Sequence, residues 1–103
     1  MNNDAETIGL AAEICKEFEG FRALPYKCPA GVWTIGYGST RHPNGLRVSE
    51  STPEISEARA EKWLYAHLLK ELPKMQTLID VELKPHQEAA LLDFVYNLSL
   101  IHI

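Results

Sequence analysis

Apolar residues recur at intervals of three and four positions near the start of the chain. The series consists of Ile8, Ala11, Ile14, Cys15 and Phe18. This spacing places the side chains along one face of a helix. Asn3 or Asp4 can cap the start of that helix, and Gly20 suits the left-handed position after its end. We therefore predict an amphipathic helix whose last turn contains Glu19.

The pattern changes between residues 23 and 48. Glycines and prolines there separate short runs of β-branched and aromatic residues. Such runs are typical of short strands, with turns expected at residues 29–31 and 42–45. We predict a small three-stranded antiparallel sheet, which needs a helix to pack against.

A second helix is predicted to begin after Ser56, which is placed as an N-cap with the apolar residue Ile55 just outside it. Pro73 is expected to end or kink this helix. Its buried face is predicted to contain Ala60, Trp63, Leu64, either His67 or Leu68, and Leu72. A shorter segment through Met75, Leu78 and Ile79 should follow.

A third helix is predicted to open with Pro85 at its first position. The residues expected to point inward are Leu91, Leu92, Phe94, Val95 and Leu98. The order of elements predicts an α+β fold. No internal repeat or low-complexity tract divides the chain.

Size and charge limit the class of protein. A chain of 103 residues is one domain with a small core, and its net charge of −4 argues against nucleic acid or an anionic membrane as the main partner. Neither a signal peptide nor a membrane-spanning run is visible, so we expect synthesis in a cytoplasm. The histidines and cysteines do not show metal-ligand spacing, so neither a metal nor a cofactor is expected.

Glu19 is the first candidate for catalysis. The alternative interpretation is that Glu19 is an ordinary solvated helix residue. The C-terminal end of a helix disfavours a carboxylate, and Phe18 and Phe21 could shield this one from water. Both effects raise the pKa of a carboxyl group, as a general acid near neutral pH requires.

Cys28 and Thr34 lie on either side of the predicted turn at residues 29–31, so their side chains could hold a water molecule together. Cys28 could instead be a small buried apolar residue or form a disulfide with Cys15, although a reducing compartment disfavours the disulfide. Thr34 could simply be a strand former. These alternatives remain open at the level of the residues.

The combined motif resembles a known family. The catalytic signature of the phage-type lysozymes is a glutamate, followed after eight residues by an aspartate or cysteine and after five more residues by a threonine. Glu19, Cys28 and Thr34 match this signature. The flanking residues 18–22, 26–31 and 33–38 are also similar to this family, as are residues 56–64 and 94–98. The resemblance covers roughly residues 8 to 98.

The resemblance implies a peptidoglycan hydrolase that cleaves the β-1,4 bond between N-acetylmuramic acid and N-acetylglucosamine with inversion, for lysis of the host cell. It implies that Glu19 is the general acid, that Cys28 stands where many members have aspartate, and that Thr34 positions the attacking water. The family's cleft residues fall on Tyr26, Gly38, Thr40, Tyr96 and Asn97. The expected protein is a monomer without stable membrane insertion. It is synthesised in the host bacterial cytoplasm and reaches the wall through a holin.

Two departures from the family pattern stand out. Many relatives have histidine where this chain has Ser39, and His42 is a speculative substitute. Relatives also continue after Leu98 with a glycine-rich turn and more helices. We expect residues 1–98 to be a partial catalytic domain with an incomplete C-terminal helical lobe, and residues 99–103 to be a non-native tail. The alternative function is an inactive or vestigial fragment of the same fold that binds peptidoglycan.

Overall fold

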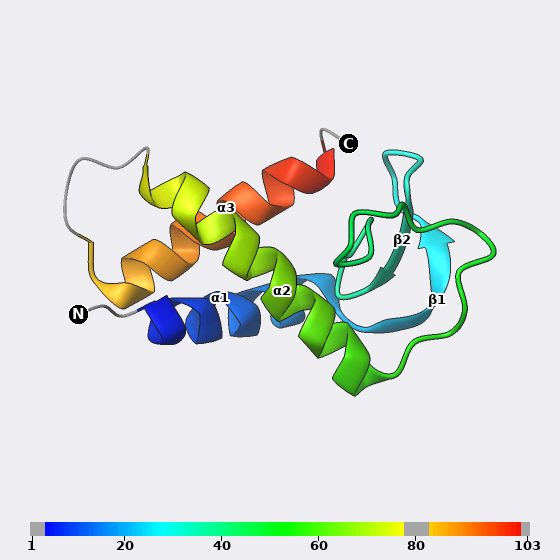
Figure 1. The fold of residues 1–103 in the computed structure, drawn as a ribbon, viewed down its shortest axis with the longest axis horizontal. Helices are drawn as coiled ribbons and strands as arrows, with labels where there is room; N and C mark the ends of the chain where they lie inside the picture. The colour runs from blue at the N-terminus through cyan, green and yellow to red at the C-terminus, as the bar shows by residue number, and fades with distance from the viewer. Residues whose placement is uncertain (1–3, 78–82, 102–103) are drawn as a thin grey trace.

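The computed structural model describes residues 4–77 and 83–101, with the side chains of the last helix described as far as residue 96. A helix comes first, two strands follow, and two more helices complete the order. The two strands and their loops lie at one end, and the three helices cross one another at the other (Figure 1). The predicted α+β class is confirmed. None of the described helices is long and apolar enough to cross a membrane.

The first helix, α1, spans Asp4–Glu19. Gly20 follows it with φ of +70°, and its amide donates to the carbonyl of Lys16 at 3.0 Å, so the predicted left-handed C-terminal position is confirmed. Asn3 lies outside the described residues. The predicted apolar face is correct for Ile8, Ala11 and Cys15, whereas Ile14 is only half-buried. Phe18 is 79% exposed, so its predicted inward placement is wrong.

The sheet has two strands rather than the predicted three. Strand β1, Arg22–Lys27, pairs antiparallel with β2, Trp33–Gly36, and the register places Tyr26 opposite Thr34. The remaining segment contributes only isolated bridges, Ile35 with Ser39 and Arg41 with Arg47. Gly36 and Gly38 both have positive φ, so the backbone leaves the extended conformation at the end of β2 and in the loop after it.

Both predicted turns are present. The amide of Gly31 donates to the carbonyl of Cys28 at 2.8 Å, which closes the turn between β1 and β2. In the second turn the amide of Gly45 donates to the carbonyl of His42 at 2.8 Å. Gly31 and Gly45 have φ of +82° and +96°, values that glycine adopts without the strain of a side chain.

Helix α2 spans Glu57–Gln76. Its predicted cap is confirmed, because the Ser56 hydroxyl accepts from the amide of Arg59 at 3.1 Å. The helix continues through Pro73 to Gln76, so of the two predicted effects, an end or a kink, Pro73 does not end the helix. Its buried residues are Ala60, Leu64, Leu68, Leu72 and Met75. Met75 therefore belongs to this helix, while Leu78 and Ile79 lie outside the described residues.

Helix α3 spans Pro85–Ile101 and begins at the predicted proline. Leu92 is fully buried, and Leu91 and Val95 pack against the core from partly exposed positions. Phe94 is 59% exposed, which contradicts its predicted inward orientation, and the side chain of Leu98 lies outside the described part. Helices α1 and α3 pack closely, and α2 crosses them toward the sheet (Figure 1). This packing brings the end of α1 against both α3 and the loop after β2.

Candidate active site

Glu19 is the last residue of α1 and is half-buried. Its carboxyl group lies against the backbone of Gly38, in the loop that follows β2. A Cβ built on Gly38 would lie 2.9 Å from Oε1 of Glu19 and 3.0 Å from its Cδ. The loop therefore covers the carboxyl, and only a residue without a side chain leaves space for it.

The pKa of Glu19 is raised above its ordinary value, first because burial penalises the carboxylate and second because the charge of Asp93 repels it. The pKa of Glu19 is therefore shifted in the expected direction, but the expected shielding by Phe18 is absent. Phe18 points into solvent, and the ring of Phe21 packs on Tyr37 with centroids 5.7 Å apart.

Cys28 directly follows β1 and is a half-buried free thiol. Burial alone would raise its pKa. Hydrogen bonds from the backbone at Val32 and Ala30 stabilise the thiolate, the side chain of Thr34 adds to this effect, and the net pKa is lowered from its ordinary value. Cys15 is likewise a free thiol, so the alternative of a disulfide with Cys28 is absent.

Thr34 lies in β2 and is only 3% exposed. Its hydroxyl donates to the carbonyl of Val32, the residue just before β2, at 3.0 Å. The structure thus brings Thr34 and Cys28 together across the turn between β1 and β2, as their spacing suggested.

Tyr26 interacts with both Glu19 and Cys28. It is half-buried in β1, and the guanidinium of Arg22 stacks over its ring at 4.4 Å from the centroid. The pKa of Tyr26 is raised, mainly by burial and then by the charges of Glu19 and Cys28, while Arg22 opposes the shift. Glu19 and Cys28 therefore both act on one phenol group.

The remaining predicted cleft residues differ in exposure. Thr40 is 4% exposed, and its carbonyl accepts from the amide of Val48 at 2.9 Å. Tyr96 is 3% exposed and donates from its hydroxyl to the carbonyl of Tyr37 at 3.1 Å. Tyr96 thus supports the loop that covers Glu19 from inside the protein. Asn97 follows it in α3, but its side chain lies outside the described part.

Ser39, the position where many relatives carry histidine, is buried and paired through its backbone with Ile35, with both hydrogen bonds at 2.9 Å. Its hydroxyl makes no hydrogen bond to the described residues. His42 does not replace the histidine at this point, because its ring packs on Trp63 of α2 with centroids 4.7 Å apart.

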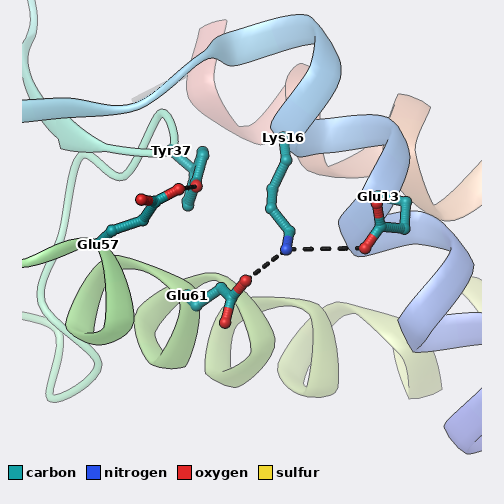
Figure 2. A network of polar contacts seen from close by, with 5 residues as sticks. All are labelled: Glu13, Lys16, Tyr37, Glu57 and Glu61. Atoms are coloured by element: carbon teal, nitrogen blue, oxygen red, sulfur yellow. Dashed lines mark hydrogen bonds and ion pairs between the residues drawn. The ribbon is translucent and has the colours of Figure 1, made fainter.

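A polar network links the loop after β2 to α2 (Figure 2). The hydroxyl of Tyr37 donates to the carboxylate of Glu57 at 2.5 Å. Beside it, Lys16 of α1 pairs with Glu61 of α2 and lies 3.6 Å from Glu13. These contacts hold α1, α2 and the Gly-Tyr-Gly loop in one arrangement around Glu19.

Two residues near the site were not predicted to be part of it. Cys15 donates from its sulfur to Oδ1 of Asp93 at 3.0 Å, and both side chains are buried. A signal was present in the sequence, because Asp93 is the single charged residue in the apolar run of residues 91–96. Its partner could not be identified from periodicity alone.

Comparisons with known proteins identify the family of this chain. Residues 16–100 match the phage lysozyme family. The chain is 31% identical over 87 residues to an endolysin of Acyrthosiphon pisum secondary endosymbiont phage 1, an alignment that covers 84% of this chain and 56% of that protein. The chain therefore spans little more than half the length of this curated relative.

Two solved structures share the fold. The endolysin from Escherichia coli O157:H7 phage FAHEc1 superimposes with a TM-score of 0.77 at 28% identity, over 89% of this chain and 59% of that one. The muramidase domain of SpmX from Asticaccaulis excentricus gives a TM-score of 0.69 at 27% identity, over 87% and 57% of the two chains. On the family match, which includes Glu19, Cys28 and Thr34, this chain belongs to the phage lysozyme family.

Proposed function

We propose that this chain carries the catalytic site of a muramidase, a peptidoglycan hydrolase that cleaves the β-1,4 bond between N-acetylmuramic acid and N-acetylglucosamine with inversion. The observation that carries the proposal is the half-buried Glu19 carboxyl, covered by Gly38 and with a raised pKa. A glycosidase needs such a group to protonate its leaving oxygen. The names of the relatives, endolysin and muramidase domain, support the same class of reaction.

In the proposed reaction, Glu19 donates its proton to the glycosidic oxygen as the bond from that oxygen to the anomeric carbon breaks. A water molecule forms the new bond to the anomeric carbon from the opposite face, which inverts the configuration. Cys28 and Thr34 hold this water, and the lowered pKa of the Cys28 thiol lets its thiolate accept the proton that the water loses. Burial and the Asp93 charge favour the protonated form of Glu19 before the next turnover.

The remaining expectations form part of this proposal. Tyr26, Gly38, Thr40, Tyr96 and Asn97 belong to the walls or supports of the cleft that receives a peptidoglycan strand. The protein acts as a monomer on the wall after release from the host cytoplasm. The endolysin names of the relatives are consistent with this role in lysis.

The test compares the chain with its Glu19→Gln variant on purified peptidoglycan. We expect new reducing ends with the parent and at least about a hundredfold fewer with the variant, because Gln cannot donate the proton. Glu17→Gln is the matched control, since Glu17 is an exposed glutamate on the same helix. Proton NMR of the first product would show the α-anomer if the reaction inverts.

Two results would contradict the proposal. Equal rates for the parent and Glu19→Gln would remove Glu19 from the acid role. Binding of peptidoglycan by the folded parent without new reducing ends would instead support the alternative of a binding fragment that has lost turnover.

A further inference from the structure

Asp93 is a buried acidic residue next to the site. It lies in α3 between the buried Leu92 and the exposed Phe94, and its own side chain is only 9% exposed. Carboxylates are rarely buried to this extent without a specific partner, because removal from water penalises the charged form. The burial of Asp93 therefore calls for an explanation in terms of its surroundings.

Asp93 accepts a hydrogen bond from a thiol of α1. Sγ of Cys15 donates to Oδ1 of Asp93 at 3.0 Å. Burial, followed by this hydrogen bond, raises the pKa of Cys15 far above its ordinary value, so the thiol keeps its proton. Cys15 precedes Glu19 by four residues, and residues four apart lie on the same face of a helix. The hydrogen bond thus holds the Asp93 carboxylate against the face of α1 that carries Glu19 one turn after Cys15.

We propose that Asp93 is a positioning residue whose buried charge, held by Cys15, keeps the carboxyl of Glu19 in its proton-donating form. The inference rests on the proposed function, because it assigns Asp93 a part in the same general-acid step. Asp93 itself does not touch the reacting atoms in this role. It acts through Glu19.

Among the described residues, groups on three elements interact electrostatically with Glu19. They are Cys15 on α1, Tyr26 on β1, and Asp93 and Tyr96 on α3. None of these four groups carries a positive charge, and the guanidinium of Arg22 is stacked on the ring of Tyr26. A like charge disfavours ionisation of a neighbouring carboxyl, and the Asp93 charge raises the pKa of Glu19 in addition to burial.

The experiment follows the side-chain carboxyl resonance of Glu19 by carbon-13 NMR as the pH is changed. In Asp93→Asn, which keeps an oxygen to accept from Cys15, we expect the midpoint of Glu19 to fall by roughly half to one pH unit. The alkaline limb of the pH profile of kcat/KM should move down by the same amount. A merely structural role of Asp93 would change the rate without moving this limb.

Glu88→Gln is the matched control. It removes the same charge from the same helix, at a carboxylate in the first turn of α3 that accepts from Thr7 at 2.9 Å. The Glu19 midpoint should stay unchanged in this variant. An equal shift in both variants would overturn the proposal, and so would an unchanged midpoint in a folded Asp93→Asn protein.

If Asp93→Asn does not fold, Asp93→Ser supplies the test, because it removes the same charge and has a smaller side chain. The Glu19 midpoint should fall in this variant as well. An unchanged midpoint in a folded Asp93→Ser protein would overturn the inference. Glu19→Gln separates the two proposals, because full activity there rejects the acid role, whereas an unmoved Glu19 midpoint with an inactive Glu19→Gln rejects only the role of Asp93.

Discussion

The backbone of Gly38 lies so close to the carboxyl of Glu19 that a Cβ at position 38 would be 2.9 Å from Oε1. Gly38 also has φ of +78°, a conformation that disfavours other residues. Two features therefore favour glycine at position 38, its left-handed backbone conformation and the close contact with the Glu19 side chain. The hydroxyl of Tyr96, bonded to the carbonyl of Tyr37, holds this loop in place.

Gly38→Ala should reduce peptidoglycan hydrolysis by at least about tenfold, because the new methyl group displaces the Glu19 carboxyl from its place. Gly31→Ala is the matched control. Gly31 has a similar φ of +82°, but a Cβ there would meet nothing within 4 Å. Both variants should lose about 1–2 kcal/mol of stability from the left-handed backbone. Equal activity of the two folded variants would show that the contact with Glu19 is unimportant.

Cys28 should react with iodoacetamide at least about tenfold faster than Cys15 at pH 8. The lowered pKa of Cys28 increases its thiolate fraction, whereas Cys15 is buried with a pKa raised by that burial and by Asp93. Peptide mass spectrometry after timed quenching measures both rates. Faster labelling of Cys15 in the folded chain would contradict the described environments.

Alkylation of Cys28 should also abolish hydrolysis, because the added group occupies the place of the attacking water. Cys28→Asp serves as the control, since a carboxylate can hold the same water and does not react with the reagent. We expect this variant to remain active before and after treatment. An alkylated parent that keeps its full rate would remove Cys28 from the proposed mechanism.

Tyr37→Phe should lower the free energy of unfolding by about 2 kcal/mol at pH 7, because the buried hydroxyl donates to the Glu57 carboxylate. Burial, with this hydrogen bond, raises the pKa of Tyr37 to about 12, above the value of roughly 10 in an unfolded chain. A raised pKa contributes stability that is present below pH 10 and is lost between about pH 10 and 12.

Urea unfolding of the parent and Tyr37→Phe from pH 7 to 11 tests this linkage. The difference in stability between the two proteins should shrink above pH 10, since only the parent can ionise at this position. Glu57→Gln should narrow the pH range over which this stability is lost, because the neutral amide stabilises the phenol less. A constant difference across the whole range would contradict the assignment.

His67 should make the protein less stable in acid. Burial lowers the pKa of His67, and its Nε2 lies 2.9 Å from the carbonyl of Arg41, to which a neutral ring can donate. A lowered pKa contributes stability that is present above the unfolded value of about 6.5 and is lost as the pH falls through the folded value.

His67→Gln retains a donor for the Arg41 carbonyl but cannot become charged. Its thermal midpoint should therefore fall less than that of the parent between pH 7.5 and 5. His86→Gln, at an exposed position of α3, is the control and should follow the parent. A parallel decline of all three proteins would show that His67 does not carry the effect.

Local structure could be predicted from the sequence because short-range physics determines it. The Ser56 cap, the Gly20 position after α1 and the turn that joins Cys28 to β2 each depend on residues within about five positions of one another. The same short spacing placed Glu19 at the end of a helix and Thr34 across the turn from Cys28. These features carried the family assignment.

Tertiary packing decided what surrounds these groups. Periodicity placed Phe18 in the core, but the packing leaves it in solvent, and burial of Glu19 comes from the Gly38 loop. The contact of Cys15 with Asp93 joins residues 78 positions apart. No local pattern specifies such a pair, because it depends on how α1 and α3 cross. The sequence by itself therefore determined which groups carry the chemistry, and the tertiary structure determined the burial and charge that set their pKa values.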